Sequence, residues 1–171
     1  MERVVILGPG GAGKTTVANE LAERTGLPLV YLDRIFWRKS WAPAPRDEAE
    51  RELAEAVEHE RWILDGNFLA SPCGRFERAD TVVFLDLSRR LCLWRVLSRC
   101  VRDRSRSRAD LPASEGFDLE LLRWIWRYPR VDRPRVLELL EGLPEQVRVH
   151  RLRTRAEVRV FLESSQATSS R

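Results

Sequence analysis

Short apolar runs are spaced along the chain and predict the strands of a sheet. Residues 4–7, 29–33, 62–65 and 81–86 are largely apolar at consecutive positions, which is typical of strands buried on both faces of a parallel sheet. Residues 147–152 instead alternate apolar and polar side chains, as a half-buried strand does. The pattern therefore predicts five strands.

The segments between these runs place apolar residues three or four positions apart, which is the period of a helix packed on one side. Helices are predicted over residues 14–24, 47–60, 88–101, 118–128, 134–141 and 155–163. The spacing of a capping box recurs at two helix starts, in Asp47–Glu50 and in Thr154–Glu157. Pro129 is expected to end one helix and Pro134 to lie in the first turn of the next.

Strands that alternate with helices predict βαβ units. This order indicates an α/β fold in which helices cover both faces of a five-stranded parallel sheet. Ligands bind at the carboxyl edge of such a sheet. The residues expected to gather there are Gly8, Asp33, Asp65 and Asp86.

The composition fits one globular domain. The chain has 171 residues with 9 Gly and 9 Pro, and 43% of them are hydrophobic, which excludes collagen-like and largely disordered chains. Residues 1–163 are expected to form the domain and 164–171 a flexible tail. No apolar stretch approaches the roughly 18 residues that cross a bilayer, and no signal-peptide core begins the chain. We therefore expect a soluble, cytoplasmic protein that does not contact membranes.

The cysteines predict neither a metal centre nor a disulfide framework. Cys73, Cys92 and Cys100 are odd in number and lack the Cys-x-x-Cys spacing of zinc sites. His59 and His150 are the two histidines of the chain. The cysteines are therefore expected to be structural thiols.

The charge of the chain draws attention to one lysine. A net charge of +4 suits phosphate-bearing partners, but the excess is too small to indicate a nucleic-acid binder. Among 30 basic residues only Lys14 and Lys39 are lysine. A bias toward arginine codons explains why arginine is used at most basic positions. A lysine at position 14 then indicates a position that needs a compact ammonium group.

The pattern Gly8-x-x-x-x-Gly13-Lys14-Thr15 matches the P-loop between a predicted strand and a predicted helix. Glycines let successive backbone N–H groups converge on a phosphate chain at the helix N-terminus. Lys14 is expected to contact the β and γ phosphates of ATP, and Thr15 to be a ligand of Mg²⁺. The predicted nucleotide contacts are Gly8, Gly10, Gly11, Ala12, Gly13, Lys14, Thr15 and Thr16. The alternative is a glycine-rich turn that only joins a strand to a helix.

The rest of the chain narrows the class of P-loop protein. Switch GTPases use an Asn-Lys-x-Asp element to read the base, and the sequence has none. Motor and transporter ATPases need a longer chain. A three-layer sandwich of the P-loop NTPase type that acts as a small-molecule kinase is the interpretation that fits.

Four aromatic motifs lie outside the P-loop, in Leu32–Trp37, at Trp41, in Trp62–Phe68 and in Trp124–Pro129. Together with the P-loop they resemble the adenylate-kinase-related P-loop proteins known as FlaR-type or DNA topology modulation proteins, over residues 3–162. The resemblance implies phosphoryl transfer from ATP, as in nucleoside-monophosphate kinases. The label about DNA topology implies no mechanism in these residues.

The resemblance also implies roles at the end of the 62–65 strand. Asp65 stands where such kinases have a carboxylate that holds Mg²⁺ through water; a capped strand end is the alternative, because Asp-Gly also favours turns. Asn67 stands where adenylate kinases have Pro-Arg after Asp-Gly-Phe, so one phosphate-binding arginine is missing and AMP is disfavoured as the acceptor. Asp65 and Asn67 are both expected at the acceptor site.

Several arginines receive catalytic roles by the same resemblance. Arg95 and Arg99 lie four residues apart and resemble the pair at the start of the kinase lid, which implies that Arg95 stacks on the adenine of ATP. Arg99 would reach the transferred phosphoryl group, because guanidinium is planar and offers several donors. Arg133 is expected to swing toward this group, with Arg127 and Arg130 as rivals.

Two segments are expected to surround the acceptor. Residues 34–60 form the acceptor-binding segment, and residues 100–117, rich in arginine, form a lid. Asp33 is expected to bind the acceptor or to accept the proton of its hydroxyl group. Phe36 and Trp37 are expected to form an apolar wall beside it, or alternatively to belong to the core.

We therefore expect a kinase that transfers the γ-phosphoryl group of Mg·ATP to a small molecule, with a nucleotide or nucleoside favoured over another hydroxyl compound. One alternative is an ATP-binding regulator associated with nucleic acid, without phosphoryl transfer. Its binding face would be formed by Arg148, Arg151, Arg153 and Arg155. An ATPase that uses water as the acceptor is another. The sequence leaves open whether the protein is a monomer or a homodimer.

Overall fold

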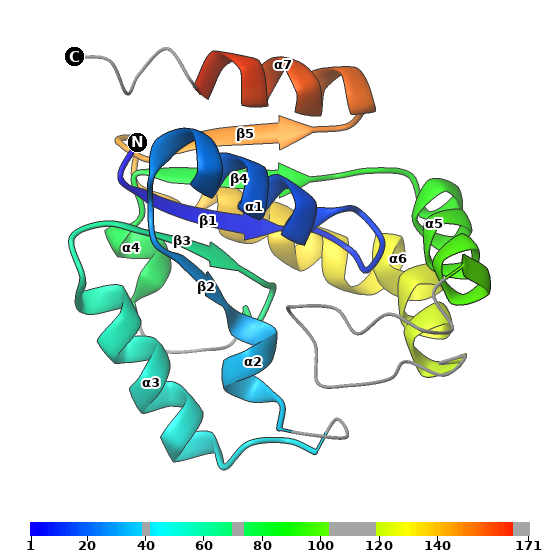
Figure 1. Ribbon diagram of the computed structural model, residues 1–171, viewed down its shortest axis with the longest axis horizontal. Coiled ribbons are helices and arrows are strands. Elements are labelled where there is room, and N and C mark those ends of the chain that lie inside the picture. Colours follow the sequence, from blue (N-terminus) through cyan, green and yellow to red (C-terminus); the bar gives the residue numbers. More distant parts are fainter. Residues whose placement is uncertain (39–41, 70–73, 103–118, 166–171) are drawn as a thin grey trace.

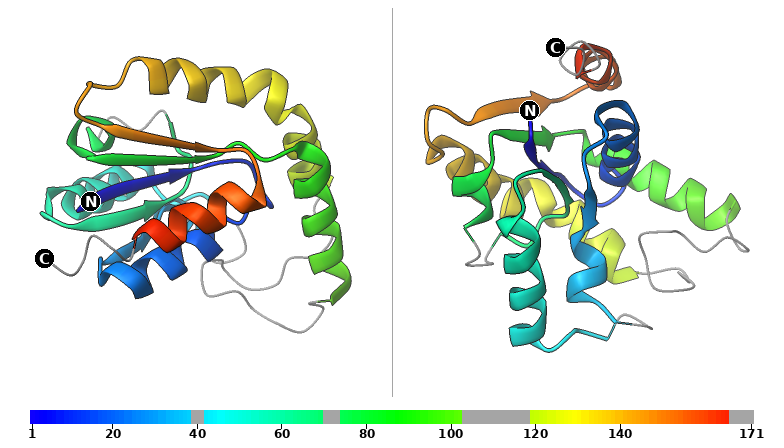
Figure 2. Two further views of the ribbon diagram at one scale, coloured as in Figure 1. Left: turned by 90° about the horizontal axis from the view of Figure 1, so that it is seen from above. Right: turned by 60° about the vertical axis from the view of Figure 1, so that its left-hand side comes forward.

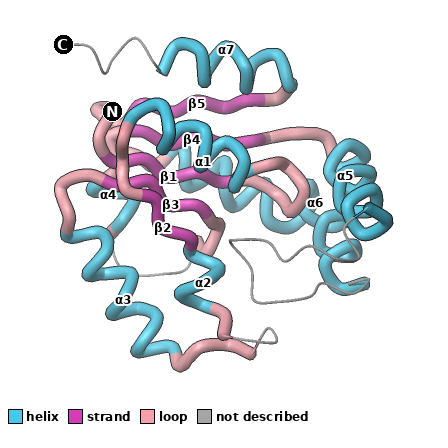
Figure 3. Tube along the Cα trace, in the orientation of Figure 1, coloured by secondary structure: helices cyan, strands magenta, loops and turns pink. Residues whose placement is uncertain are grey.

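The computed structural model describes residues 1–38, 42–69, 74–102 and 119–165. Five parallel strands form one sheet in the order β2-β3-β1-β4-β5 (Figure 1, Figure 3). The strands are β1 (Arg3–Leu7), β2 (Leu29–Tyr31), β3 (Trp62–Asp65), β4 (Thr81–Leu85) and β5 (Arg148–Leu152). The predicted α/β class and five-stranded parallel sheet are confirmed.

Helices cover both faces of the sheet and make three layers (Figure 2). The helices are α1 (Lys14–Thr25), α2 (Leu32–Phe36), α3 (Arg46–Glu58), α4 (Arg75–Arg78), α5 (Arg89–Arg102), α6 (Leu119–Glu141) and α7 (Arg155–Ser165). One core joins the sheet to α1, α5 and α7, and the other joins it to α2, α3, α4 and most of α6. The central strand β1 is buried on both sides, because Val4 faces the first core and Val5 the second.

The second strand is shorter than its apolar run. β2 ends at Tyr31, and Leu32 and Asp33 already belong to the short helix α2. Leu32 and Ile35 are buried by this turn of the chain, and the Leu32 side chain packs so closely on Gly66 that a Cβ there would lie 2.7 Å from Leu32 Cβ. Asp33 therefore lies in the first turn of a helix, where an acidic side chain is favoured by the helix dipole, and not in a strand.

Only one of the two predicted capping boxes forms. Glu157 N–H donates to Thr154 Oγ1 at 3.1 Å, and the Glu157 carboxylate accepts from Arg153 N–H at 2.7 Å, so the start of α7 is capped by these side chains. At α3 the cap residue is Pro45, without a side-chain cap. Glu50 there accepts from Arg46 instead, at 2.7 Å. An i,i+4 ion pair has replaced the predicted Asp47–Glu50 box.

One prediction about helices is wrong. Pro129 and Pro134 do not separate two helices, because both lie inside the single helix α6. Each proline removes one backbone N–H from the ladder. The buried side chains of Ile125, Tyr128 and Val136 pack on the sheet on either side of these positions, and this packing outweighs the local preference. The first turns of α6 lie beside α5, and the later turns cover the sheet (Figure 2).

Three further expectations concern the lid, the C-terminal tail and the absence of membrane-spanning helices. The predicted lid, 100–117, lies almost entirely outside the described residues, as does Trp41. α7 continues to Ser165, two residues into the segment expected to be a tail. Among the described residues, no helix combines the length and the apolar character that crossing a membrane requires.

Candidate active site

The P-loop joins β1 to α1 in a conformation that depends on glycine. Gly11 and Gly13 have φ angles of 76° and 95°, in the left-handed region that side chains rarely adopt. A Cβ at Gly11 would lie 2.5 Å from the carbonyl oxygen of Cys92 in α5. The loop therefore packs directly against the α5 backbone, and its curvature gathers N–H groups at the start of α1.

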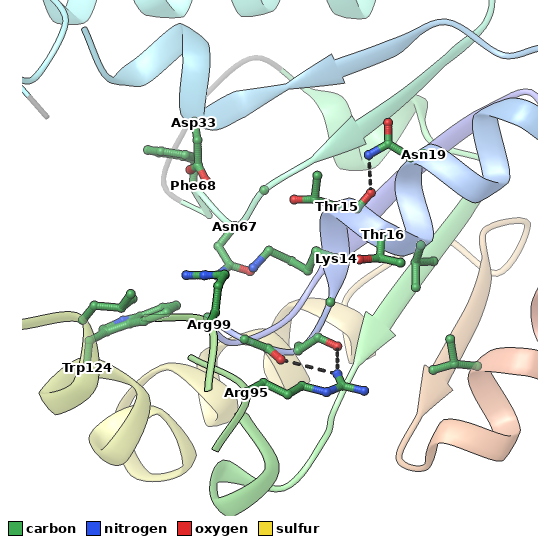
Figure 4. Close-up of a pocket in the computed structure, with 18 of the residues that line it drawn as sticks. Lys14, Thr15, Thr16, Asn19, Asp33, Asn67, Phe68, Arg95, Arg99 and Trp124 are labelled. Carbon is green, nitrogen blue, oxygen red and sulfur yellow. Dashed lines mark hydrogen bonds between the residues drawn. The ribbon is translucent and has the colours of Figure 1, made fainter. Parts of the chain in front are cut away.

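Lys14, the first residue of α1, folds back over this loop. Its Nζ donates to the carbonyl oxygens of Gly8 at 3.0 Å and Pro9 at 3.3 Å. The side chain is half-buried and points into a cavity (Figure 4). The sequence predicts that this ammonium group contacts the phosphates of a bound nucleotide.

Thr15 and Asp65 bring two hard oxygen donors together. The Thr15 hydroxyl donates to Asp65 Oδ2 at 2.7 Å, and the Asp65 side chain, at the carboxyl end of β3, belongs to a residue that is 5% exposed. Hydroxyl and carboxylate oxygens are ligands that Mg²⁺ prefers. No described residues form a cluster of three acidic, His or Cys side chains. This donor set fits an ion held by Thr15 and phosphate oxygens, with Asp65 bonded through water.

Asn67 anchors the P-loop to the segment after β3. Its Oδ1 accepts from Gly8 N–H at 3.0 Å, and its Nδ2 donates to Gly8 O at 2.9 Å. The fully buried Arg75 donates to the carbonyl oxygens of Asn67 and Phe68 and so fixes this segment in turn. Asn67 lines the cavity, but its amide is engaged with the P-loop, a contact that the sequence did not indicate.

The cavity beside the P-loop has a volume of about 1150 Å³, which is larger than most single-ligand pockets. Gly10 to Val17 form its floor. On one side of Lys14 lie Asp33, Phe68 and Trp124 (Figure 4). Val158 and Leu162 of α7 line it as well. The volume is sufficient for a nucleotide beside the P-loop and a second small molecule beside Asp33, Phe68 and Trp124.

Two arginines of α5 reach the same cavity. Arg95 Nη1 donates to Ala12 O at 2.7 Å and to Gly11 O at 3.4 Å, so its guanidinium is held beside the P-loop backbone. Burial, together with the positive charge of Arg155, lowers the pKa of Arg95 below its ordinary value. Arg99, one turn later, also lines the cavity and extends toward Lys14 and Asn67 (Figure 4). Three cations thus gather where phosphates are expected.

The side of the cavity expected to bind the acceptor combines a carboxylate with aromatic rings. Asp33 and Trp37, both expected at the acceptor site, line the cavity. Phe36 is not among the lining residues; its ring stacks on Phe68 with centroids 4.1 Å apart and planes 15° apart. Phe36 therefore supports Phe68, and Phe68 forms the wall.

Arg133 lies away from this cavity. Its Nε and Nη2 donate to the two oxygens of Asp86, at 2.8 and 3.0 Å, and Arg151 donates to Asp86 Oδ2 at 2.7 Å. The rivals Arg127 and Arg130 are exposed on α6. Asp86, expected at the carboxyl edge, is thus the centre of an ion-pair cluster at the end of β4. The structure does not bring Arg133 together with Lys14 and Thr15.

The Asp86 cluster predicts a pH-dependent contribution to stability. Burial alone would raise the pKa of Asp86, but hydrogen bonds from Arg133 and Arg151 outweigh it, and the pKa lies below its ordinary value of 3.8. The ionised form is therefore stabilised by folding above pH 3.8, and this contribution is lost as the pH falls through the lower folded-state pKa.

Asp86→Asn is expected to reduce the free energy of unfolding by about 2 kcal/mol at pH 7, because two arginines lose their shared counter-ion. The effect is smaller than for a fully buried pair, since the Arg133 and Arg151 side chains are 34% and 28% exposed. Urea unfolding at pH 7 and pH 3 measures it. The difference from wild type should shrink at pH 3, and equal stability at pH 7 would contradict the interpretation.

Some residues that line the cavity were not predicted from the sequence. Glu120, Leu121 and Trp124 reach the cavity from α6. Leu121 and Trp124 contact the place where a Gly10 Cβ would be. Leu121 and Trp124 are three residues apart, and the Trp124 ring packs against Tyr128 four residues later, so the three side chains lie on one face of the helix. No local signal in the sequence indicates that this face lies over the P-loop.

The four arginines of the basic face expected for a nucleic-acid regulator differ in exposure. Arg148, Arg153 and Arg155 are exposed on β5 and at the start of α7. Arg151 is engaged with Asp86. One of these four arginines is therefore already paired within the fold.

Comparisons with known sequences match parts of the chain. The isopentenyl transferase family model matches residues 1–61. Thirty-five residues are 57% identical to adenylate dimethylallyltransferase from Allorhizobium ampelinum, covering 20% of this chain and 15% of the relative. Sixty-nine residues are 35% identical to adenylate kinase from a Mycobacterium species, covering 40% of this chain and 33% of the relative. The chain thus matches a third or less of each of these curated relatives.

Comparisons of structure cover the whole chain. Shikimate kinase from Acinetobacter baumannii superposes with a TM-score of 0.59 at 19% identity, over 100% of this chain and 96% of that one. A gluconokinase from Sinorhizobium meliloti gives a TM-score of 0.54 at 18% identity, over 99% and 91%. The fold is therefore that of P-loop kinases. The finer FlaR-type assignment stays a prediction.

Proposed function

We propose that this protein transfers the γ-phosphoryl group of Mg·ATP to a hydroxyl group of a small molecule. The observation that carries the proposal is that Lys14 and Thr15 line one cavity next to a P-loop backbone, with the Thr15 hydroxyl bonded to Asp65. The kinase fold and the partial match to an adenylate kinase support it.

The nucleotide half of the cavity would bind the triphosphate of ATP. Backbone N–H groups of the P-loop would bind its phosphates, and Lys14 would exchange its bonds to Gly8 and Pro9 for phosphate oxygens. Arg95 and Arg99 would stabilise the charge that spreads over the transferred phosphoryl group. Mg²⁺, when bound by Thr15 and through water by Asp65, would neutralise charge on the β and γ phosphates.

The acceptor half favours a flat, hydroxylated compound, for which a nucleoside is the first candidate. Trp37 and Phe68 offer ring faces for stacking. Asp33 lies on the same side of Lys14 as Phe68, and a carboxylate there would accept the proton of an attacking hydroxyl group. Segment 34–60 would contribute to binding through Trp37. A hydroxyl metabolite without a flat ring, as in shikimate or gluconate kinases, is the next candidate.

An acceptor panel tests this proposal. ADP release is measured with nucleosides, nucleoside monophosphates and hydroxylated metabolites, and each product is identified by mass. We expect ADP release that depends on an added hydroxyl compound and a product that has gained one phosphoryl group. ADP release at the same rate without any acceptor would instead indicate an ATPase.

Asp33→Asn should lower kcat about a hundredfold with a hydroxyl acceptor while leaving the KM for ATP nearly unchanged, because the side chain would act on the acceptor proton only. Glu145→Gln is the control, because this substitution also removes one negative charge. Glu145 is exposed and lies outside the cavity. Unchanged kcat in the Asp33 variant would contradict the role of this carboxylate.

A second candidate is transfer of an isopentenyl group, favoured by the family match over residues 1–61. That segment includes the P-loop and Asp33, and the backbone N–H groups of a P-loop form an anion-binding concavity that can accept a diphosphate. Incubation with an isoprenoid diphosphate and AMP distinguishes the two. Release of diphosphate together with a prenylated nucleotide would replace the kinase proposal.

A further inference from the structure

A second cavity of about 440 Å³ begins at Pro9, next to the first. It lies among the end of β4, the start of α5, the middle of α6 and the end of β5. None of the residues to which the proposed function gives a role with ATP or the acceptor lines it. The side chains that line it have no role in the proposed phosphoryl transfer.

Positive charge dominates this second cavity. Its lining includes the arginines Arg89, Arg133, Arg151 and Arg153 and a single carboxylate, Asp86. Three positive charges are therefore left over after Asp86 is paired. A concave surface with such an excess attracts anions, and arginine is the residue best suited to bind phosphate oxygens through paired N–H groups.

Asp86 organises two of these arginines without using all their donors. Arg133 and Arg151 each donate to it through Nε and Nη2. Among the described residues, no hydrogen bond engages Nη1 of either guanidinium. A guanidinium has five N–H bonds, so both can bind a second anion while they hold Asp86. The ion pairs fix the two guanidinium groups in place before a ligand arrives.

Tyr128 gives an independent indication of a ligand. The residue lines the cavity, is 3% exposed, and its hydroxyl has no hydrogen-bond partner within the described part of the chain. Burial, and then the negative charges of Asp132 and Asp86, raise the pKa of this hydroxyl, so it remains a donor. A buried hydroxyl without a partner is costly and rare, and an anion in the cavity would supply one.

The N-terminus of α5 adds to the same field. Ser88 lines the cavity, and its Oγ accepts from Leu91 N–H at 3.4 Å at the start of this 14-residue helix. The positive end of the helix dipole is therefore directed toward the cavity wall. It reinforces the arginines and the Tyr128 hydroxyl.

We propose that this cavity is a second anion site, distinct from the P-loop, that binds phosphate, either as the free ion or as the phosphate group of a small metabolite. Pro9 connects it to the P-loop, because the Pro9 carbonyl accepts from Lys14. Helix α6 lines both cavities, with Trp124 in the first and Tyr128 in the second. A phosphate bound here would therefore rest against the same helix and loop as the nucleotide.

Titration calorimetry with inorganic phosphate, at constant ionic strength set with chloride, tests the site. Arg153→Gln is expected to weaken binding at least about tenfold. Arg148→Gln is the matched control, because it also removes one positive charge. Arg148 is exposed on β5 and does not line the cavity. Equal phosphate affinity in these two variants would overturn the proposal.

Phosphate also fits the P-loop, so the titration is repeated with Lys14→Ala. This variant should keep the binding step that Arg153→Gln weakens. Loss of that step in Lys14→Ala, together with its persistence in Arg153→Gln, would place the phosphate in the P-loop and overturn the second site. The outcome does not depend on which acceptor the protein phosphorylates, since no turnover is measured.

Tyr128→Phe separates a ligand-binding hydroxyl from a structural defect. Without phosphate the variant should unfold at an equal or higher temperature than wild type, because it removes an unpartnered buried donor. With saturating phosphate, wild type should gain more thermal stability than the variant. Equal gains in wild type, Tyr128→Phe and Arg153→Gln would contradict the proposal. Free phosphate and a phosphate monoester are compared in separate titrations to identify the better ligand.

Discussion

Lys14→Ala is expected to reduce phosphoryl transfer about a thousandfold while the protein stays folded. Within the described part of the chain the ammonium group donates to the Gly8 and Pro9 carbonyls, and Asn67 still anchors Gly8 when that group is gone. The fold should therefore tolerate the change. Catalysis should not, because no other lysine among the described residues lines the cavity.

The measurement is kcat/KM from coupled ADP release, with thermal unfolding as the control for folding. Lys14→Arg is the matched variant that keeps the charge. It should restore little activity, because a planar guanidinium cannot occupy the place of a compact ammonium group. Wild-type turnover in Lys14→Ala would remove this residue from the active site.

Asp65→Asn is expected to lower kcat by about a hundredfold or more and to raise the Mg²⁺ concentration needed for half-maximal activity. The amide oxygen of asparagine can still accept from Thr15, so the short contact at 2.7 Å need not be lost. What disappears is the negative charge that attracts a hydrated cation.

A Mg²⁺ titration of activity distinguishes the metal role from a structural one. Thr15→Ser retains a hydroxyl ligand and should keep most activity, whereas Thr15→Val should follow Asp65→Asn. If the Asp65 variant loses activity without any change in Mg²⁺ dependence, this carboxylate only stabilises the end of β3.

The P-loop and the sheet could be predicted because their signals are local. β1 contains a run of four apolar residues, Val4 to Leu7, followed by glycine, and the side chains of this run are buried on both faces of the sheet. The motif from Gly8 to Thr16 carries its own conformation, since glycine allows the positive φ angles at Gly11 and Gly13. No knowledge of distant residues was needed for either.

The rest of the site depends on contacts between distant segments. Asn67 lies 59 residues from the Gly8 backbone to which it bonds, so its role as an anchor has no sequence signature. The continuity of α6 through Pro129 and Pro134 depends on the packing of Tyr128 and Val136 against the sheet. Arg133 was expected at the active site by resemblance, but Asp86, 47 residues away, binds it at the second cavity.

A crystal structure with Mg²⁺ and a non-hydrolysable ATP analogue tests the central claim most directly. We predict that the triphosphate lies along the backbone from Gly10 to Thr16, that Lys14 Nζ has left the Gly8 and Pro9 carbonyls for phosphate oxygens, and that Thr15 Oγ1 coordinates the metal ion. Nucleotide bound elsewhere, or Lys14 still on those carbonyls with nucleotide present, would contradict the account.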